Sequence, residues 1–338
     1  MGDDYLKSIH WFRGFAILVI TAMHSTLYPI EQHYWGKYFI ELIANGTTFF
    51  IFIAGYLFWH LIDRYHYSKY LIKKAKYVLC PYIILLTITL VGIYVLNVFG
   101  IRSIDYSRFD YIVSLSNVLE ENGFFWHYFV GGAIIKPFWF IPMIIVYYIL
   151  TPVFIWLAKG KLIYLTLCLA VVCSLVVERN SFVLNNFFHF LGFWFLGIFC
   201  KIKQDTINRN SIQLFLFGFT LSLLVMLFSV DTDIELDVNV VNIQKMFLCI
   251  TILSFFMFLE KHEINMNFFN VLADYSFGIF FIHYYMVIPC VFLVNYLELQ
   301  NTIFDFVFCF IVPVLSSILV VKILRFFLKE RSKYFVGV

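Results

Sequence analysis

The sequence predicts an all-α membrane protein: a polytopic bundle of about ten transmembrane helices with both termini in the cytoplasm. Of the 338 residues, 62% are hydrophobic and only 13% are charged, whereas a soluble domain carries about 25% charged residues. Apolar runs of roughly 20 residues, long enough to cross a bilayer as helices, recur along the whole chain. Finally, Lys and Arg are distributed unevenly between the loops that separate these runs.

The expected spans follow the apolar runs in order. They are 12–30, 38–62, 78–99, 137–157, 162–178, 183–200, 211–230, 241–259, 270–296 and 304–327. The segment 123–140 is too broken by glycine and proline for a clean span, and we expect a re-entrant or interfacial piece there. No polar stretch is long enough to fold separately. Residues 1–338 are therefore expected to form a single membrane domain without a separate soluble domain.

The orientation follows from the basic residues. With the N-terminus in the cytoplasm, most of the 24 Lys and Arg residues fall in cytoplasmic loops or flanks, as the positive-inside rule requires. The basic residues left on the outer side are Lys37, Arg102, Arg108, Lys136 and Arg179. The net charge of +3 gives no reason to expect a nucleic-acid partner.

Cysteine usage argues against a disulfide framework or a metal site. The seven cysteines are an odd number, lie in or beside apolar runs and show no CxxC spacing. They are expected to be packing residues. The first apolar run lacks a small-residue cleavage site after it, so it is not interpreted as a removable signal peptide.

The first apolar run carries two cationisable residues, Arg13 and His24, eleven positions apart. At about 100° per residue their azimuths differ by roughly 20°, so they share one helix face, about 16 Å apart along the axis. Arg13 is expected at the cytoplasmic edge and His24 about halfway across a core of ~30 Å. An ionisable group at that depth by default faces a cavity or a partner. The pair suits a long substrate with an anionic head, such as acyl-coenzyme A.

These residues also have structural interpretations, which the sequence leaves open. Arg13 alone could be a snorkelling anchor, and His24 alone could be a histidine satisfied by hydrogen bonds inside the bundle. The lysines at 73, 74 and 76, which precede Pro81, could be positive-inside anchors or could attract phosphate as point charges.

Five motifs in order resemble the acyltransferase 3 family of integral membrane acyltransferases. "WFRGFAILVITAMHS" (11–25) is similar to the family's opening helix, with Arg, ten residues and then His. "NGTTFFIFIAGYLF" (45–58) resembles its Phe-rich second helix, although Ala54 replaces the usual serine. "YLIKKAKYVLCPYII" (70–84) resembles its basic third-helix entry, with lysines in place of arginines. "FWFIPMIIVYYILTPVF" (138–154) and "DYSFGIFFIHYYM" (274–286) resemble two later blocks.

The resemblance implies an integral membrane acyltransferase. Such an enzyme would move an acyl group, with acetyl expected, from cytoplasmic acyl-CoA to a hydroxyl of a cell-envelope polysaccharide, lipopolysaccharide or related glycan. His24 would be the general base, and Arg13, Lys73 and Lys76 would hold the coenzyme A phosphates. Trp139, Tyr275 and His283 are further candidates, on the acceptor side or supporting the site. By default, however, Trp139 and Tyr275 are aromatic-belt or bundle-packing residues, and His283 is a structural, hydrogen-bonded histidine.

The same resemblance implies the setting. The protein would be a multi-pass protein of the bacterial inner membrane, with acyl-CoA as a donor substrate and no tightly bound cofactor. Its partners would be acyl-CoA, the glycan acceptor and membrane lipids, with a separate extracytoplasmic acyltransferase protein as a further candidate. Two rival interpretations remain open: a transporter or flippase of a lipid-linked or acylated envelope precursor, and a sensor or scaffold without turnover. A transporter would be expected to show two related halves with paired discontinuous helices, and none are visible.

Overall fold

The computed structural model describes residues 6–25, 34–98, 135–180, 182–231, 238–297 and 302–337. All regular structure in these ranges is helical, which confirms the predicted fold class. The main helices are α1 (Lys7–Ser25), α2 (Tyr34–Ile43), α3 (Thr47–His60), α4 (Tyr67–Lys74), α5 (Cys80–Val98), α7 (Phe140–Ile149), α8 (Thr151–Leu157), α9 (Leu162–Val176), α10 (Val183–Ile202), α11 (Gln204–Arg209), α12 (Ser211–Asp231), α13 (Val238–Lys261), α14 (Asn267–Tyr296), α15 (Thr302–Leu328) and α16 (Lys333–Val336).

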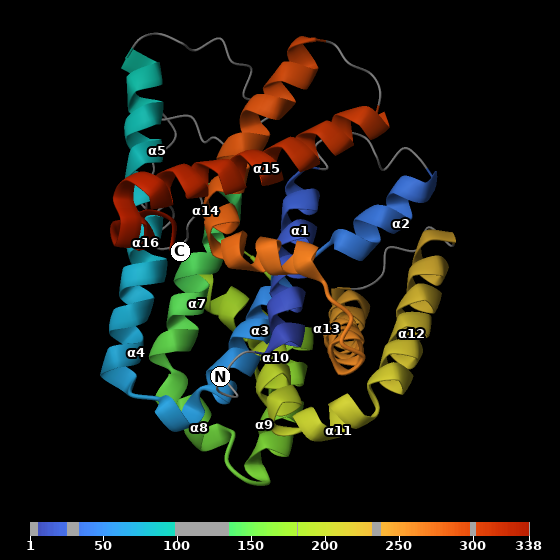
Figure 1. Ribbon diagram of the computed structural model, residues 1–338. Coiled ribbons are helices and arrows are strands. Elements are labelled where there is room, and N and C mark those ends of the chain that lie inside the picture. Colours follow the sequence, from blue (N-terminus) through green and yellow to red (C-terminus); the bar gives the residue numbers. More distant parts are fainter. Residues whose placement is uncertain are drawn as a thin grey trace.

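Two helix pairs form the centre of the bundle. Helix α1 packs on α14, and α3 packs on α10. Helix α15 packs against α14 and crosses in front of α1 and α14 (Figure 1). Helices α12 and α13 pack together on one side of this centre, and α4 and α5 lie on the other. Segments from the two ends of the chain therefore meet in the middle of the molecule.

Glycines allow the closest of these helix contacts. A Cβ atom at Gly14 would meet the Phe269 carbonyl oxygen of α14, and one at Gly197 would meet the Phe52 carbonyl oxygen of α3. Because small residues let two backbones approach closely inside a membrane bundle, these positions set the spacing of the two central pairs.

Phenylalanines fill the space between the central helices. The ring of Phe12 on α1 lies 5.7 Å from that of Phe49 and 5.8 Å from that of Phe52, both on α3, and 6.3 Å from that of Phe256 on α13. All four side chains are buried, and their tilted rings match the geometry that aromatic quadrupoles favour. The first helix is thus packed into the core of the bundle.

In the described part of the chain, seven helices or merged helix pairs are long and apolar enough to cross a membrane, and eight if one bent pair counts as a span. The predicted number of ten is therefore not confirmed. Seven expected spans correspond to these seven, whereas α1 and the 15-residue α9 do not meet the same criterion. At about 1.5 Å per residue α9 is roughly 22 Å long, shorter than a ~30 Å hydrocarbon core.

The expected span 137–157 is not one straight helix. It begins as a 3₁₀ turn (Lys136–Trp139), continues as α7 and then bends by 60° into α8. Pro152 lies at the start of α8 and has no backbone N–H to continue the hydrogen bonding of α7, which explains the break. Most of the segment 123–140, expected to be re-entrant or interfacial, lies outside the described residues.

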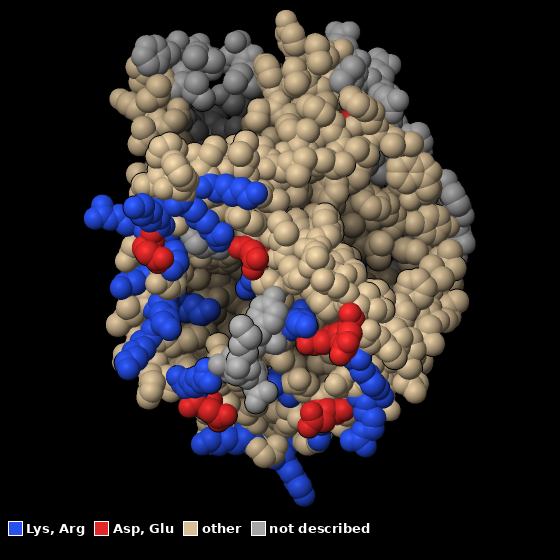
Figure 2. Space-filling view, viewed as in Figure 1, with Lys and Arg blue, Asp and Glu red and all other residues tan. Residues whose placement is uncertain are grey.

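Charged residues gather at one end of the molecule. In Figure 2, Lys, Arg, Asp and Glu gather in the lower part of the visible face and reach somewhat above mid-height on the left, and the surface beside these basic side chains is hollowed. The upper part of the same face is almost entirely uncharged. This separation supports the predicted placing of the basic loops on one side of a membrane.

Candidate active site

Helix α1 presents Arg13 and His24 to the same neighbour. Arg13 Nη2 donates a 2.8 Å hydrogen bond to the carbonyl oxygen of Ala273, and the His24 ring centre lies 5.3 Å from that of His283. Both contacts are with α14, so the two side chains share one helix face, as the eleven-residue spacing predicts. Ala273 precedes His283 in the chain, so α1 and α14 run in the same direction along this interface.

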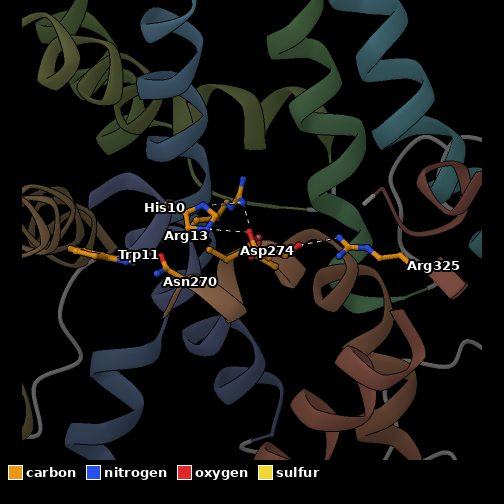
Figure 3. A network of polar contacts seen from close by, with 8 residues as sticks. His10, Trp11, Arg13, Asn270, Asp274 and Arg325 are labelled. Atoms are coloured by element: carbon orange, nitrogen blue, oxygen red, sulfur yellow. Dashed lines mark hydrogen bonds and ion pairs between the residues drawn. The ribbon is translucent and has the colours of Figure 1, made fainter. Parts of the chain in front are cut away.

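At the Arg13 end, a chain of polar contacts crosses from α1 to α14 (Figure 3). Arg13 Nη2 lies 3.4 Å from His10 Nδ1, and a guanidinium can only donate, so Nδ1 accepts. The proton of a neutral His10 ring is then on Nε2, which lies 3.2 Å from Asp274 Oδ1. Next to them, Trp11 Nε1 donates a 2.7 Å hydrogen bond to Asn270 Oδ1. The orientation of Arg13 is thus set by neighbours on both helices.

Helix α15 adds further basic residues to this cluster. Arg325 Nη2 donates a 3.2 Å hydrogen bond to the Asp274 carbonyl oxygen, and its guanidinium lies over the Tyr275 ring, 4.7 Å from the centroid. Lys322 Nζ lies 5.8 Å from the same ring centre. Tyr275, a predicted candidate for the acceptor side or a supporting role, therefore lies among basic residues near the Arg13 end of α1.

At the other end of α1, His24 lies within an aromatic group from α14. Besides His283, the Tyr284 ring lies 5.5 Å away in an edge-on arrangement. His283 is fully buried, and its Nδ1 lies 2.9 Å from the carbonyl oxygens of both Ile279 and Phe280. Carbonyls only accept, so Nδ1 carries a proton. In a neutral ring the lone pair is then on Nε2, a buried atom without a hydrogen-bond partner in the described structure.

The residue after His24 fixes the end of α1 to α15. Ser25 Oγ lies 2.8 Å from the Cys309 carbonyl oxygen and 2.8 Å from that of Thr21. Pro313 lies inside α15 and has no N–H for the carbonyl four residues earlier, which is that of Cys309. The Ser25 hydroxyl therefore satisfies a carbonyl that proline leaves without its helical partner, and this anchors the helix next to His24.

The predicted phosphate-binding lysines lie on α4 and in the helical turn that follows it. Lys73 and Lys76 are exposed, and within the described ranges neither makes a hydrogen bond or ion pair. Lys74 turns inward, with its Nζ 4.5 Å from the ring centre of Tyr148 and 5.2 Å from that of Tyr70. The described residues show no direct contact between these two lysines and Arg13, and the turn that contains Lys76 contacts α16, which packs on α14.

Trp139 lies beside a second basic group, on the His24 side. The Arg179 guanidinium lies over its indole, 4.3 Å from the ring centre, and Phe190 stacks on it at 5.5 Å. Arg179 and Lys136 are both close enough to His24 to act on it electrostatically. Sequence reasoning assigned neither residue to the site, although both were exceptions to the positive-inside pattern and that signal could have identified them.

The sequence analysis did not assign Lys322 and Arg325 to the site either. A basic pair at the end of the last span is also what membrane anchoring alone would produce.

Among the described residues, no group of three His, Cys, Asp or Glu side chains is arranged to hold a metal ion. The site that the structure assembles is one helix face with a cationic cluster at one end and two neighbouring imidazoles at the other.

Comparison with known proteins gives a family match. The family model of the acyltransferase 3 family, described as an acyltransferase domain, matches residues 6–322, nearly the whole chain. No curated protein and no solved structure matches the chain significantly. The motifs that carry the resemblance, the family match and the apolar helical bundle agree. The chain therefore belongs to the acyltransferase 3 family and is a multi-pass membrane acyltransferase.

Proposed function

We propose that the protein transfers an acyl group, with acetyl expected, from acyl-CoA to a hydroxyl of a cell-envelope glycan, using His24 as the general base. The observation that carries the proposal is the position of His24. It lies next to the buried imidazole of His283 on α14, and on the same face of α1 as Arg13. A multi-pass protein of the bacterial inner membrane, as the family resemblance implies, would have the donor on one side and the acceptor on the other.

In the proposed reaction, His24 removes the proton from the acceptor hydroxyl as its oxygen attacks the thioester carbonyl. A new ester C–O bond forms and the C–S bond breaks. The imidazolium of His24 then gives its proton to the departing thiolate, so the ring is neutral again at the end of the cycle. General-base catalysis of this kind typically contributes 10²–10⁴-fold to the rate.

His283 would orient the base. Its Nδ1–H is committed to the backbone of α14, so its Nε2 lone pair is available to accept an N–H from His24. Such a contact would leave the lone pair of His24's other ring nitrogen free for the acceptor hydroxyl. The arrangement follows the general rule that a catalytic base is itself held by a third group.

The donor's phosphates would bind at the opposite end of α1. Arg13, Lys322 and Arg325 lie on neighbouring helices around Asp274 and Tyr275. Arginine binds phosphate through paired N–H groups. About 16 Å of helix separates Arg13 from His24, a gap that the extended arm of acyl-CoA would bridge. Lys73 and Lys76 would contribute only long-range attraction.

The test uses purified protein in nanodiscs and follows release of free coenzyme A from acetyl-CoA, with and without a glycan acceptor. His24→Ala should reduce turnover by roughly 10²–10⁴-fold without lowering expression or the unfolding temperature. The matched control is His66→Ala, because His66 is exposed at the start of α4 and its side chain caps nothing there. Near-native turnover by His24→Ala, or an equal loss in His66→Ala, would rule out His24 as the base.

A further inference from the structure

Arg179 and Lys136 are exceptions to the positive-inside pattern, and both lie toward the end of the bundle that contains His24. Arg179 lies in the short connection between α9 and α10, and Lys136 opens the 3₁₀ turn before α7. Under the predicted orientation both are on the outer side, where basic residues are few. Lys136 begins the turn that packs against α14 near His283, and Arg179 stacks on Trp139 of the same turn, although the two residues come from segments far apart in the chain.

The Arg179 guanidinium is held in place from two directions. Its flat face lies on the Trp139 indole, 4.3 Å from the ring centre, and its Nη1 lies 3.5 Å from Asn45 Oδ1 in the turn between α2 and α3. Asn45 adopts a left-handed backbone conformation with φ 54°, which asparagine tolerates better than most residues. Stacking occupies the face of the guanidinium but leaves most of its in-plane N–H donors available.

The connection that carries Arg179 is itself anchored in the bundle. His189 is almost fully buried, and its Nδ1 donates a 2.8 Å hydrogen bond to the Val177 carbonyl oxygen, two residues before Arg179. The buried Asn242 side chain of α13 donates to the Ser174 carbonyl oxygen at 3.0 Å, near the end of α9. Polar groups buried in a bundle are costly unless they are satisfied, so this network holds the connection in a defined position.

Trp139 is contacted by two side chains of the protein itself. Phe190 stacks on it, with ring planes 24° apart, and Arg179 covers it as well. The 3₁₀ turn that contains it packs against α14, where Phe138 lies 6.0 Å from Phe281, two residues from His283. Trp139 thus positions a cation next to the catalytic histidines.

We propose that Arg179, with Lys136, binds an anionic group on the acceptor, so that the preferred acceptor is a glycan with a carboxylate or phosphate near the hydroxyl that is acylated. This inference rests on the proposed function, because it requires the acceptor to reach His24 from this side. The guanidinium would bind the anion through its in-plane N–H groups, and the lysine ammonium would add a second positive charge.

The experiment compares two water-soluble acceptors that differ only in charge, methyl β-D-glucuronide and methyl β-D-glucoside. Binding is measured by saturation-transfer difference NMR, and acetyl transfer from labelled acetyl-CoA by mass spectrometry, both in phosphatidylcholine nanodiscs. Native protein should favour the glucuronide by about tenfold or more in both measurements, equivalent to about 1.4 kcal/mol. Arg179→Gln should abolish the preference by raising KM for the glucuronide, with kcat and the glucoside values unchanged.

Two control variants separate charge recognition from folding. Arg179→Lys keeps the positive charge without the paired donors and should retain part of the preference. Lys37→Gln removes another exposed basic residue on the same predicted side and should change nothing. Equal loss with both acceptors in Arg179→Gln would mean that the cation serves the reaction centre or the fold, and would overturn the inference, as would the absence of any preference in native protein.

The same design distinguishes this inference from the function on which it rests. Arg179-dependent binding of the glucuronide without acetyl transfer would support anion binding by Arg179, but it would contradict the proposed function and with it the assignment of the anion to an acceptor. Acetyl transfer without a preference for the glucuronide would support the proposed function and overturn the inference about Arg179. A lipid phosphate is the other source of an anion, so both measurements are repeated with phosphatidylglycerol. Arg179-dependent displacement of the glucuronide by that lipid would assign the site to membrane lipid and overturn the acceptor assignment.

Discussion

At His283, the direction of two hydrogen bonds determines which nitrogen can act on His24. Because Nδ1 donates to the α14 backbone, a substitution can separate the structural contact from the chemical one. In His283→Asn the amide N–H can still reach those carbonyls, but no atom replaces Nε2. We expect an unfolding temperature close to native and a turnover at least tenfold lower, measured by acetyl-CoA consumption.

His283→Phe is the companion variant, because it removes both nitrogens while keeping a ring in the buried space. We expect it to lose stability as well as turnover, since two backbone carbonyls lose a donor. Native turnover in His283→Asn would show that Nε2 has no part in the reaction and that His283 is purely structural.

Arg13 and the lysines of α4 should differ in their effect on the donor. Arg13 is partly buried and held by Ala273 and His10, whereas Lys73 and Lys76 are exposed. We expect Arg13→Gln to raise the KM for acetyl-CoA by about tenfold or more, because a partly desolvated charge contact is strong. The double change Lys73→Gln and Lys76→Gln should raise it by about fivefold or less, since exposed charges are screened. The reverse order would place the phosphates at the α4 entry.

At the scale of the element, the closeness of α1 and α14 depends on Gly14. A methyl group there would collide with a backbone oxygen, that of Phe269, which cannot rotate away as a side chain could. Gly14→Ala should therefore push the two helices apart, lowering both the unfolding temperature and the turnover. Gly92→Ala in α5 is the matched control, because no heavy atom of the described residues lies within 4 Å of its added Cβ and alanine is the better helix former by about 1 kcal/mol. A tolerated Gly14→Ala would show that the α1–α14 interface is loose.

The junction between α1 and α15 can be tested by a double-mutant cycle. Ser25→Ala leaves the Cys309 carbonyl without its side-chain donor and should cost about 1 kcal/mol of stability. Pro313→Ala supplies a backbone N–H for the same carbonyl, so Ser25→Ala should cost less in that background. The measurement is the unfolding temperature of the four proteins in detergent, and strictly additive effects would mean that the serine and the proline are not linked through Cys309.

For the whole molecule, the open question is whether the short helix α9 crosses the membrane. Lys159 precedes it and Glu178 follows it, and both are exposed. We expect Lys159→Cys to react with an impermeant maleimide only from the cytoplasmic side and Glu178→Cys only from the outer side, in a background where Cys168 and the other cysteines are replaced. Labelling of both from one side would show that α9 returns to the face on which it started.

How much of this could be predicted from the sequence differs with scale. Helical class and the shared face of Arg13 and His24 follow from composition and periodicity, which are local properties of the chain. The neighbour His283 does not, because helix pairing depends on which faces fit together, and α14 is far away in the sequence. The bend at Pro152 had a visible signal, whereas the inward turn of Lys74 toward Tyr148 depends on packing that no single motif encodes.

The pairing of α1 with α14 also has a consequence for how the protein is made. Arg13 and its acceptor at Ala273 are 260 residues apart, so the ribosome completes almost the whole chain before the first helix can meet its partner. Until then α1 lies in the insertion machinery or the bilayer, and its polar side chains need hydrogen-bond partners other than α14. Bringing such distant segments together is slow because loop closure precedes any contact. Nascent chains that stop before residue 267 therefore contain His24 but none of the α14 residues that lie beside it.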